Sequence, residues 1–207
     1  MILTDKNIRA LIDEPINGKK LIENFQEESL QSESYDLSIG NTMYRFKDNV
    51  CTIDLDNQEA VDNIYQELTI PQNGCILSPG EYVLVSLHER INLPDNITAH
   101  VRPRTRFTRL GLIVVDQHCN SSYSGVLKIG LYNATKYAIN IKTGLRIIQI
   151  LFEELKEIPS SEKLYRNKPF AIYHNETDFI GAQFPENTYS KIKSSYETLS
   201  NMLKGEK

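Results

Sequence analysis

The sequence predicts a mainly β protein, a distorted barrel or jelly-roll-like sandwich, with a short helix near the N-terminus and another helix at the C-terminus. Seven short apolar runs fall between Cys75 and Phe152, and turn residues such as Pro79-Gly80 separate them. Short strands at such spacing are typical of closed or two-layered β folds. At both ends of the chain the apolar residues instead recur every three or four positions, which indicates helices.

The N-terminal part contains one helix and one strand. The spacing of apolar residues predicts a helix over residues 6–13, which Thr4 or Asp5 can cap. Residues 26–34 are mostly polar and predict a loop. This loop leads into a strand over residues 35–39.

The middle of the chain predicts the body of the β structure. Residues 48–68 are acidic and irregular, which indicates a surface excursion between strands. Short apolar runs then alternate with turns, as expected for a barrel or sandwich. The expected strands cover residues 75–77, 81–87, 97–101, 112–115, 126–132, 138–141 and 146–152.

The C-terminus has a separate helical pattern. Its apolar residues are spaced by three and four over about two heptads, at Tyr189, Ile192, Tyr196, Leu199 and Leu203. We therefore expect a β domain over residues 1–187 and an amphipathic helix over residues 188–207. Two alternatives stay open for this helix, docking on its own barrel or contact with a neighbouring subunit.

Composition and charge exclude several classes of function. The 207 residues carry a net charge of −4, so there is no basic surplus for binding a DNA or RNA polymer. There is no apolar run of membrane-spanning length, and the first ten residues lack the apolar core of a signal peptide. The sequence thus predicts a cytoplasmic globular protein, or one of the host cytoplasm if its origin is viral.

The cysteines argue against a disulfide framework and against zinc. Cys51, Cys75 and Cys119 are odd in number and far apart, and no Cys-x-x-Cys pair is present. Zinc-dependent deaminases need a His-x-Glu and Pro-Cys-x-x-Cys constellation, which the chain lacks. We expect no metal site and no required cofactor, although Mg²⁺ can accompany a bound phosphate ligand.

Four arginines within eight residues predict a local anion site in this acidic protein: Arg102, Arg104, Arg106 and Arg109. In an extended segment the first three project to one face. Guanidinium groups gathered in this way repel each other unless an anion lies between them, and their fork suits phosphate oxygens. The alternative is a solvated basic strand.

Four segments in order resemble the dCTP deaminase and trimeric dUTPase superfamily. Residues 104–112, Arg-Thr-Arg-Phe-Thr-Arg-Leu-Gly-Leu, are similar to its Arg-Ser-Ser-x-x-Arg-x-Gly-Leu segment. Residues 34–40 (Ser-Tyr-Asp-Leu-Ser-Ile-Gly) and 77–84 (Leu-Ser-Pro-Gly-Glu-Tyr-Val-Leu) resemble deaminase segments. Residues 144–149, Gly-Leu-Arg-Ile-Ile-Gln, match a strand of both branches. The resemblance implies a dUTPase-like barrel closest to the deaminase branch, assembled as trimers with sites between subunits.

The same resemblance implies that reactive groups are missing. The position of the family's catalytic glutamate is Gly130, which can neither shuttle a proton nor activate water. The position of its loop aspartate is Asn120, which cannot act as a base. Thr105 and Arg106 stand at its paired serines, and Asp178 stands at a phosphate-binding lysine. Gly130 is also expected to leave room for a larger base or a second nucleotide moiety.

The expected site combines the arginine cluster with family-matched positions. Tyr123 resembles the aromatic residue that packs on deoxyribose, and Thr105 and His118 are the catalytic candidates if any activity remains. Asp116 is a further candidate for the lost acid. The expected ligand-binding residues are Arg102, Arg104, Thr105, Arg106, Arg109, Asn120, Tyr123, Gly125 and Gln149.

Three functions remain open. One is a catalytically impaired protein that binds, senses or sequesters a nucleotide, since loss of carboxylates and gain of arginine favour anion binding over turnover. The second is an active dCTP deaminase that converts dCTP and water to dUTP and ammonia. The third is a structural subunit that lends arginines to an active paralogue.

Overall fold

The computed structural model describes residues 1–15, 18–49, 52–55, 57–176 and 178–184. Its helices are α1 (Asp5–Asp13), α2 (Gln58–Asp62) and α3 (Thr105–Leu110). Its strands are β1 (Ile22–Glu23), β2 (Tyr35–Phe46), β3 (Tyr65–Thr69), β4 (Cys75–Leu77), β5 (Tyr82–Asn92), β6 (Ile97–Pro103), β7 (Leu112–Val114), β8 (Gln117–Cys119), β9 (Ser124–Asn133), β10 (Ile139–Ile141) and β11 (Arg146–Glu154). Short 3₁₀ turns lie at Glu27–Ser29, Ser161–Lys163 and Tyr165–Asn167.

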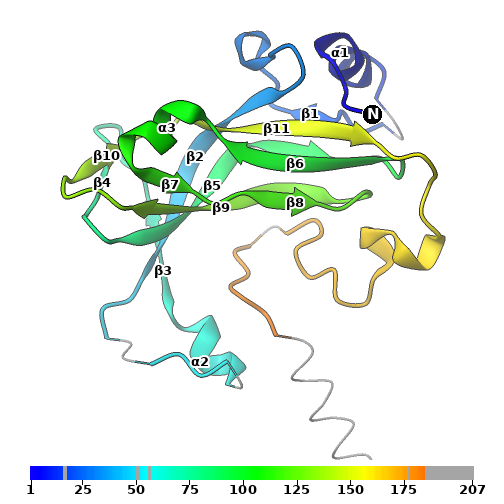
Figure 1. The fold of residues 1–207 in the computed structure, drawn as a ribbon. Helices are drawn as coiled ribbons and strands as arrows, with labels where there is room; N and C mark the ends of the chain where they lie inside the picture. The colour runs from blue at the N-terminus through cyan, green and yellow to red at the C-terminus, as the bar shows by residue number, and fades with distance from the viewer. Residues whose placement is uncertain (16–17, 50–51, 56, 177, 185–207) are drawn as a thin grey trace, which may run out of the picture.

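Nine of the described strands form one curled antiparallel sheet (Figure 1). Its hydrogen-bonded order is β7-β9-β5-β2-β11-β6-β8, with β1 added to β5 and β3 added to β2. The pairing register shifts between Ile39 and Met43 in β2 and between Ser86 and Arg90 in β5. Such irregularities bend strands, which lets the sheet curl around one core. The predicted mainly β class is confirmed.

The seven strands expected between residues 75 and 152 are all present, several of them longer than predicted. The excursion expected over residues 48–68 was wrong in part, because it contains α2 and most of β3. Strand β8 was missed, because the polar sequence Gln117-His118-Cys119 does not alternate with apolar residues although it pairs with β6. The helix expected over residues 188–207 lies outside the described residues, so the domain division stays a prediction.

The core fills the inside of the curled sheet. In β5 the alternate residues Val83, Val85 and Leu87 are buried, as the period of a half-buried strand requires. Tyr35 and Phe152 are fully buried on neighbouring strands. Helix α1 adds its buried face to the same core, and Thr4 is its N-terminal cap, with the backbone N–H donating to Asn7 Oδ1 at 3.1 Å.

A buried carboxylate joins two strands near the register shift. Glu89 on β5 is 1% exposed and accepts hydrogen bonds from the backbone N–H and the hydroxyl of Ser38, both at 2.9 Å. Burial raises the pKa of the Glu89 carboxyl, and the bonds from Ser38 oppose this shift. The two hydrogen bonds from Ser38 thus satisfy the Glu89 carboxylate, whose burial without donors would be costly.

Replacing Ser38 with alanine is expected to lower the free energy of unfolding by about 1–3 kcal/mol, because one buried carboxylate oxygen loses its donor. Urea unfolding at fixed protein concentration measures this change. Thr143→Ala, at an exposed turn, is the control and is expected to stay within about 0.5 kcal/mol of the unaltered chain. Equal effects of the two substitutions would contradict a structural role for the Ser38 hydroxyl.

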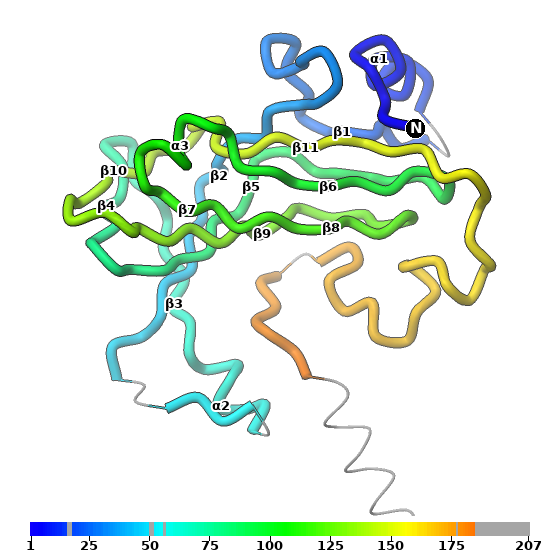
Figure 2. Tube along the Cα trace, viewed as in Figure 1, coloured from blue at the N-terminus to red at the C-terminus, as the bar shows by residue number. Residues whose placement is uncertain are grey.

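Residues 155–184, here called the C-terminal segment, turn back beneath the sheet and run toward α2 (Figure 2). Phe179 stacks on Tyr44 of β2 with ring centroids 3.7 Å apart. Gln58 of α2 donates to the carbonyl oxygen of Ala182 at 2.9 Å, and Gln183 donates to Asp62 at 2.7 Å. These contacts hold the segment against β2 and α2.

No helix among the described residues is long and apolar enough to span a membrane. Cys75 is a free, half-buried thiol and Cys119 is a free, buried one. Burial raises the pKa of the Cys119 thiol to about 12, so this cysteine behaves as a core residue rather than a reactive one. Cys51 lies outside the described residues.

Candidate functional site

The arginine cluster surrounds a short helix at one end of the sheet. Strand β6 ends at Pro103, Arg104 is the N-cap residue that precedes α3, and Gly111 follows the helix with a φ of 89°, a conformation suited to glycine. An open pocket of about 390 Å³ lies here and is called the arginine pocket. It is lined by Arg104, Thr105, Arg106, Arg109 and Gln149. Five of the nine expected ligand-binding residues therefore meet in one place.

The cluster is not one extended face, so that expectation was wrong. Arg102 belongs to β6 and Arg106 to α3, because the chain leaves the sheet at Arg104. Arg102 Nη1 instead donates to Asp116 Oδ2 at 2.9 Å, with 48% and 63% of these side chains exposed. Arg102 does not line the arginine pocket, and Asp116 is the partner of an arginine rather than a free carboxylate.

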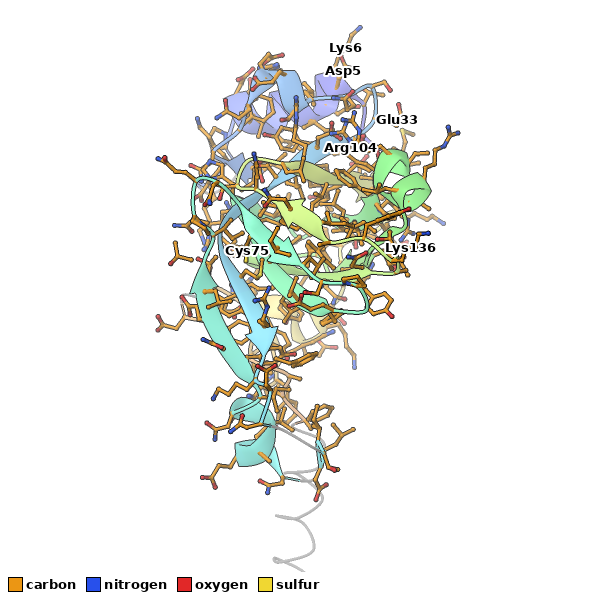
Figure 3. The ribbon with its side chains drawn as sticks, turned by 90° about the vertical axis from the view of Figure 1, so that its left-hand side faces the viewer. Asp5, Lys6, Glu33, Cys75, Arg104 and Lys136 are labelled. Atoms are coloured by element: carbon orange, nitrogen blue, oxygen red, sulfur yellow. The ribbon has the colours of Figure 1, made fainter. Side chains whose placement is uncertain are left out.

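Arg104 is held by an internal ion pair. Its Nη1 lies 3.1 Å from Asp36 Oδ2, and the same nitrogen donates to the Arg146 carbonyl oxygen at 3.3 Å. Only 19% of the Arg104 side chain and 3% of the Asp36 side chain are exposed. Burial raises the pKa of Asp36 although Arg104, Arg146 and Arg106 oppose it, and burial lowers the pKa of Arg104. Figure 3 labels Arg104 between α3 and the N-terminal segment.

Arg106 and Arg109 differ from Arg104, because both are exposed and neither side chain forms an ion pair or hydrogen bond with another described residue. They are the cations that this pocket offers to a ligand. Thr105 lies beside them with an exposed hydroxyl-bearing side chain. The geometry thus divides the three arginines of the pocket into one structural arginine, Arg104, and two that are available to an anion.

A second pocket of about 450 Å³ lies between the outer face of the sheet and the C-terminal segment, and is called the tyrosine pocket. This volume is within the range of small-molecule sites. Its aromatic lining consists of Tyr65, Tyr123, Tyr165, Tyr173 and Phe179. Its polar lining consists of Gln117, His118, Asn120, Lys128 and Glu176. Among these are two expected ligand-binding residues, Asn120 and Tyr123, and one catalytic candidate, His118.

The loop before β9 positions these residues. Ser122 has a φ of 65°, and the Tyr123 N–H donates to the Asn120 carbonyl oxygen at 3.2 Å, which closes a tight turn. Tyr123 is 7% exposed, and burial raises the pKa of its phenol. His118 lies on β8 opposite His100, with ring centroids 5.0 Å apart. Burial and then His100 lower the pKa of His118, which favours the neutral imidazole at neutral pH.

Two glycines of the expected site make room for tyrosine rings. A Cβ built at Gly130 would lie 2.8 Å from Cζ of Tyr82 and closer still to its hydroxyl. The same construction at Gly125 places a Cβ 2.9 Å from Cζ of Tyr123. The expectation that Gly130 leaves space for a larger base was wrong, since the Tyr82 ring takes that space. Gly125 leaves room for the Tyr123 ring and is not a lining residue of either pocket.

Sequence reasoning missed two charged residues of the tyrosine pocket. Lys128 lies on β9 and forms an ion pair with Glu176 of the C-terminal segment, with Nζ and Oε2 3.1 Å apart. The signal for Lys128 was a single charge in the apolar run Val126–Asn133, two positions from Gly130 and so on the same face. No local pattern marks Glu176, because only the fold brings it to β9.

Within one chain the two pockets have no lining residue in common. Helix α3 lies at the left-hand end of the sheet in Figure 1, whereas β8 lies to its right above the C-terminal segment. Thr105 and His118 therefore belong to different pockets. Among the described residues no group of three or more His, Cys, Asp or Glu side chains is arranged to hold a metal ion.

Residues 2–155, more than half of the sequence, match the dCTP deaminase-like family. This chain belongs to that family. The dCTP deaminase, dUMP-forming, of Hydrogenobaculum sp. is 37% identical over 161 residues, which cover 77% of this deaminase-like chain and 86% of that protein. The enzyme of the same name from Persephonella marina is 30% identical over 169 residues, covering 81% and 91%.

The deaminase-like fold is also that of a crystallised relative. The 2′-deoxycytidine 5′-triphosphate deaminase of Agrobacterium tumefaciens matches with a TM-score of 0.60 and 24% sequence identity. The match covers 74% of this chain and 48% of that one, so this chain spans about half the length of the crystallised protein. This likeness concerns the fold.

Proposed function

We propose that this deaminase-like chain binds a nucleotide without turning it over by the family's glutamate mechanism. The observation that supports this most is Tyr82, whose ring occupies the space beside Gly130 where a carboxylate side chain would need to start. The loop position matched to the family's aspartate is Asn120, which can donate and accept hydrogen bonds but cannot take a proton. Loss of a general acid–base group typically costs about 10²–10⁴-fold in rate.

The two pockets offer the halves of a nucleotide site. The arginine pocket has Arg106 and Arg109 free for phosphate oxygens. The tyrosine pocket offers aromatic faces for a base and sugar, and Asn120 for a hydroxyl group. Because the pockets are separate within one chain, the proposal requires that the arginine pocket of one subunit meets the tyrosine pocket of another, in a homotrimer or a multiple of it. Mg²⁺ would accompany the phosphates as part of the ligand.

An active dCTP deaminase is the second candidate, because two relatives of at least 30% identity are named dCTP deaminases. In that case His118 is the group in the tyrosine pocket best placed to move a proton, as a largely neutral imidazole. The proton would have to move without a carboxylate at position 130.

One incubation separates the two candidates. The purified protein is mixed with dCTP, dUTP, other nucleotides and linked dinucleotides, then separated from the filtrate by ultrafiltration, and both fractions are analysed by mass spectrometry. We expect an intact nucleotide retained with the protein and no dUTP or dUMP formed. Many turnovers of dCTP or dUTP would overturn the proposal and favour the enzyme.

Substitutions in the arginine pocket test where the phosphates bind. Arg106→Ala and Arg109→Ala are each expected to weaken binding of the retained nucleotide about tenfold, because each removes a charge-assisted hydrogen bond. Arg102→Ala is the matched control, since Arg102 is already paired with Asp116 outside the pocket. Isothermal titration measures the affinities. Unchanged affinity in both pocket variants would remove the arginine pocket from the proposed site.

A further inference from the structure

Lys128 is a nearly buried cation on the outer face of the sheet, where it lines the tyrosine pocket. In β9 the residues Leu127, Ile129 and Leu131 point into the core, so Lys128 points to the opposite face with Gly130. Only 14% of the Lys128 side chain is exposed. Its ammonium group donates to the Val126 carbonyl oxygen at 3.3 Å and otherwise meets the carboxylate of Glu176.

Glu176 reaches this point from the C-terminal segment through a defined turn. Asn175 has a φ of 55°, and its N–H donates to the Ser124 carbonyl oxygen at 2.7 Å, which ties the turn to the start of β9. Only 4% of the Glu176 side chain is exposed, and its Oε1 accepts the Ile180 N–H at 2.7 Å. The carboxylate therefore lies inside the wall of the tyrosine pocket, with one oxygen on Lys128 and the other on the backbone.

The surroundings of Glu176 are mainly aromatic. Burial, followed by Glu67 and then Glu176, raises the pKa of Tyr44 to about 12, and burial also raises the pKa values of Tyr165 and Tyr173, with a smaller contribution from Glu176. Tyr165, Tyr173 and Phe179 line the same pocket as Glu176, so its carboxylate lies among aromatic rings.

An ion pair is a poor anchor for this segment. Removing two charges from water is costly, and apolar residues of similar volume often stabilise a protein as well or better. The segment already has apolar anchors, among them Phe179 stacked on Tyr44. A carboxylate on a lysine has the same chemistry as a phosphate on a lysine, because both present anionic oxygens to an ammonium group. The pair therefore has the form of an anion site filled by the chain itself.

We propose that Lys128 is an anion-binding residue of the tyrosine pocket, and that Glu176 occupies its ammonium group until a phosphate of the ligand replaces it. This inference rests on the proposed nucleotide binding and adds a cation to the half of the site that has no free arginine. It follows that ligand binding detaches the Glu176 turn from β9. The C-terminal segment then changes its contacts while the sheet stays in place.

The two partners of the ion pair are expected to respond in opposite directions. Glu176→Gln keeps the acceptor for the Ile180 N–H but removes the competing charge, so dCTP and pyrophosphate should bind about tenfold more tightly. Lys128→Met removes the anion contact, so both probes should bind about tenfold more weakly. Deoxycytidine has no phosphate, so its affinity should be the same for both variants and the unaltered chain. Lys156→Met and Glu157→Gln, at two exposed positions of the C-terminal segment, are matched controls and should leave the affinities unchanged.

Hydrogen exchange of the unaltered chain gives a measurement that needs no variant to fold. Adding dCTP is expected to speed amide exchange at Asn175, because its N–H loses the Ser124 carbonyl oxygen when the Glu176 turn leaves β9. Protection of this amide on binding would overturn the displacement of Glu176.

The outcomes separate this inference from the function on which it rests. If the unaltered chain binds dCTP and both substitutions weaken binding or leave it unchanged, Lys128 and Glu176 are only a structural pair, and nucleotide binding still stands. If dCTP is turned over while Glu176→Gln binds more tightly and Lys128→Met more weakly, the proposed lack of turnover is wrong. The anion-binding role of Lys128 is then still supported. If neither the unaltered chain nor Glu176→Gln binds dCTP or pyrophosphate, both proposals are overturned.

Discussion

Replacing Asp36 with asparagine is expected to lower the free energy of unfolding by about 3–5 kcal/mol, because it leaves a largely buried guanidinium without its opposite charge. Asp36 Oδ2 lies 3.1 Å from Arg104 Nη1, and both side chains are mostly shielded from water. Asparagine has nearly the same size, so the effect reports the charge rather than a cavity. Urea unfolding at fixed protein concentration measures it.

Asp116→Asn is the matched control for that substitution, because it breaks an Arg–Asp pair of similar length with Arg102 in a neighbouring part of the chain. Both of those side chains are about half exposed or more, so the expected loss is within about 0–1 kcal/mol. Removing both Asp36 and Arg104, as Asp36→Leu with Arg104→Met, should cost less than Asp36→Asn alone. Equal losses for Asp36→Asn and Asp116→Asn would contradict the difference in burial.

Introducing glutamate at Gly130 is expected to destabilise the chain by about 1–3 kcal/mol, because the new side chain starts inside the space of the Tyr82 ring. The same change should cost less in a Tyr82→Ala background, where that space is open. Only the double variant is then expected to deaminate dCTP measurably. Its rate should exceed that of the unaltered chain by about 10²–10⁴-fold, which is the usual contribution of a general acid–base group.

Two measurements test this pair of substitutions. A double-mutant cycle in urea gives the coupling between positions 82 and 130, and ammonia release from dCTP gives the activity. Tyr132→Ala is the matched control background, because Tyr132 is an exposed residue of the same strand face and is paired with Tyr82. A gain of activity in Gly130→Glu alone, with no loss of stability, would contradict the filling of this space by Tyr82.

Local patterns in the sequence predicted much of the β structure. The apolar run over residues 81–87 and the turns around it predicted a strand, and β5 is present there, with alternate residues such as Val83 and Val85 buried. Strand β8 escaped prediction, because its side chains are polar and its pairing with β6 depends on distant residues. The arginine cluster was predicted as an anion site, but its division into a buried Arg104 and a free Arg109 depends on Asp36, far away in the chain.

The sequence by itself determined the family, the positions of seven strands along the chain and the residue types at positions such as Gly130 and Asn120, because these follow from local patterns and segment matches. Only the tertiary structure decided what surrounds them. Tyr82 fills the space beside Gly130, and Glu176 lies on Lys128, because curling of the sheet and return of the C-terminal segment bring together residues far apart in sequence. No local pattern encodes such long-range contacts, since they exist only when the whole core has packed.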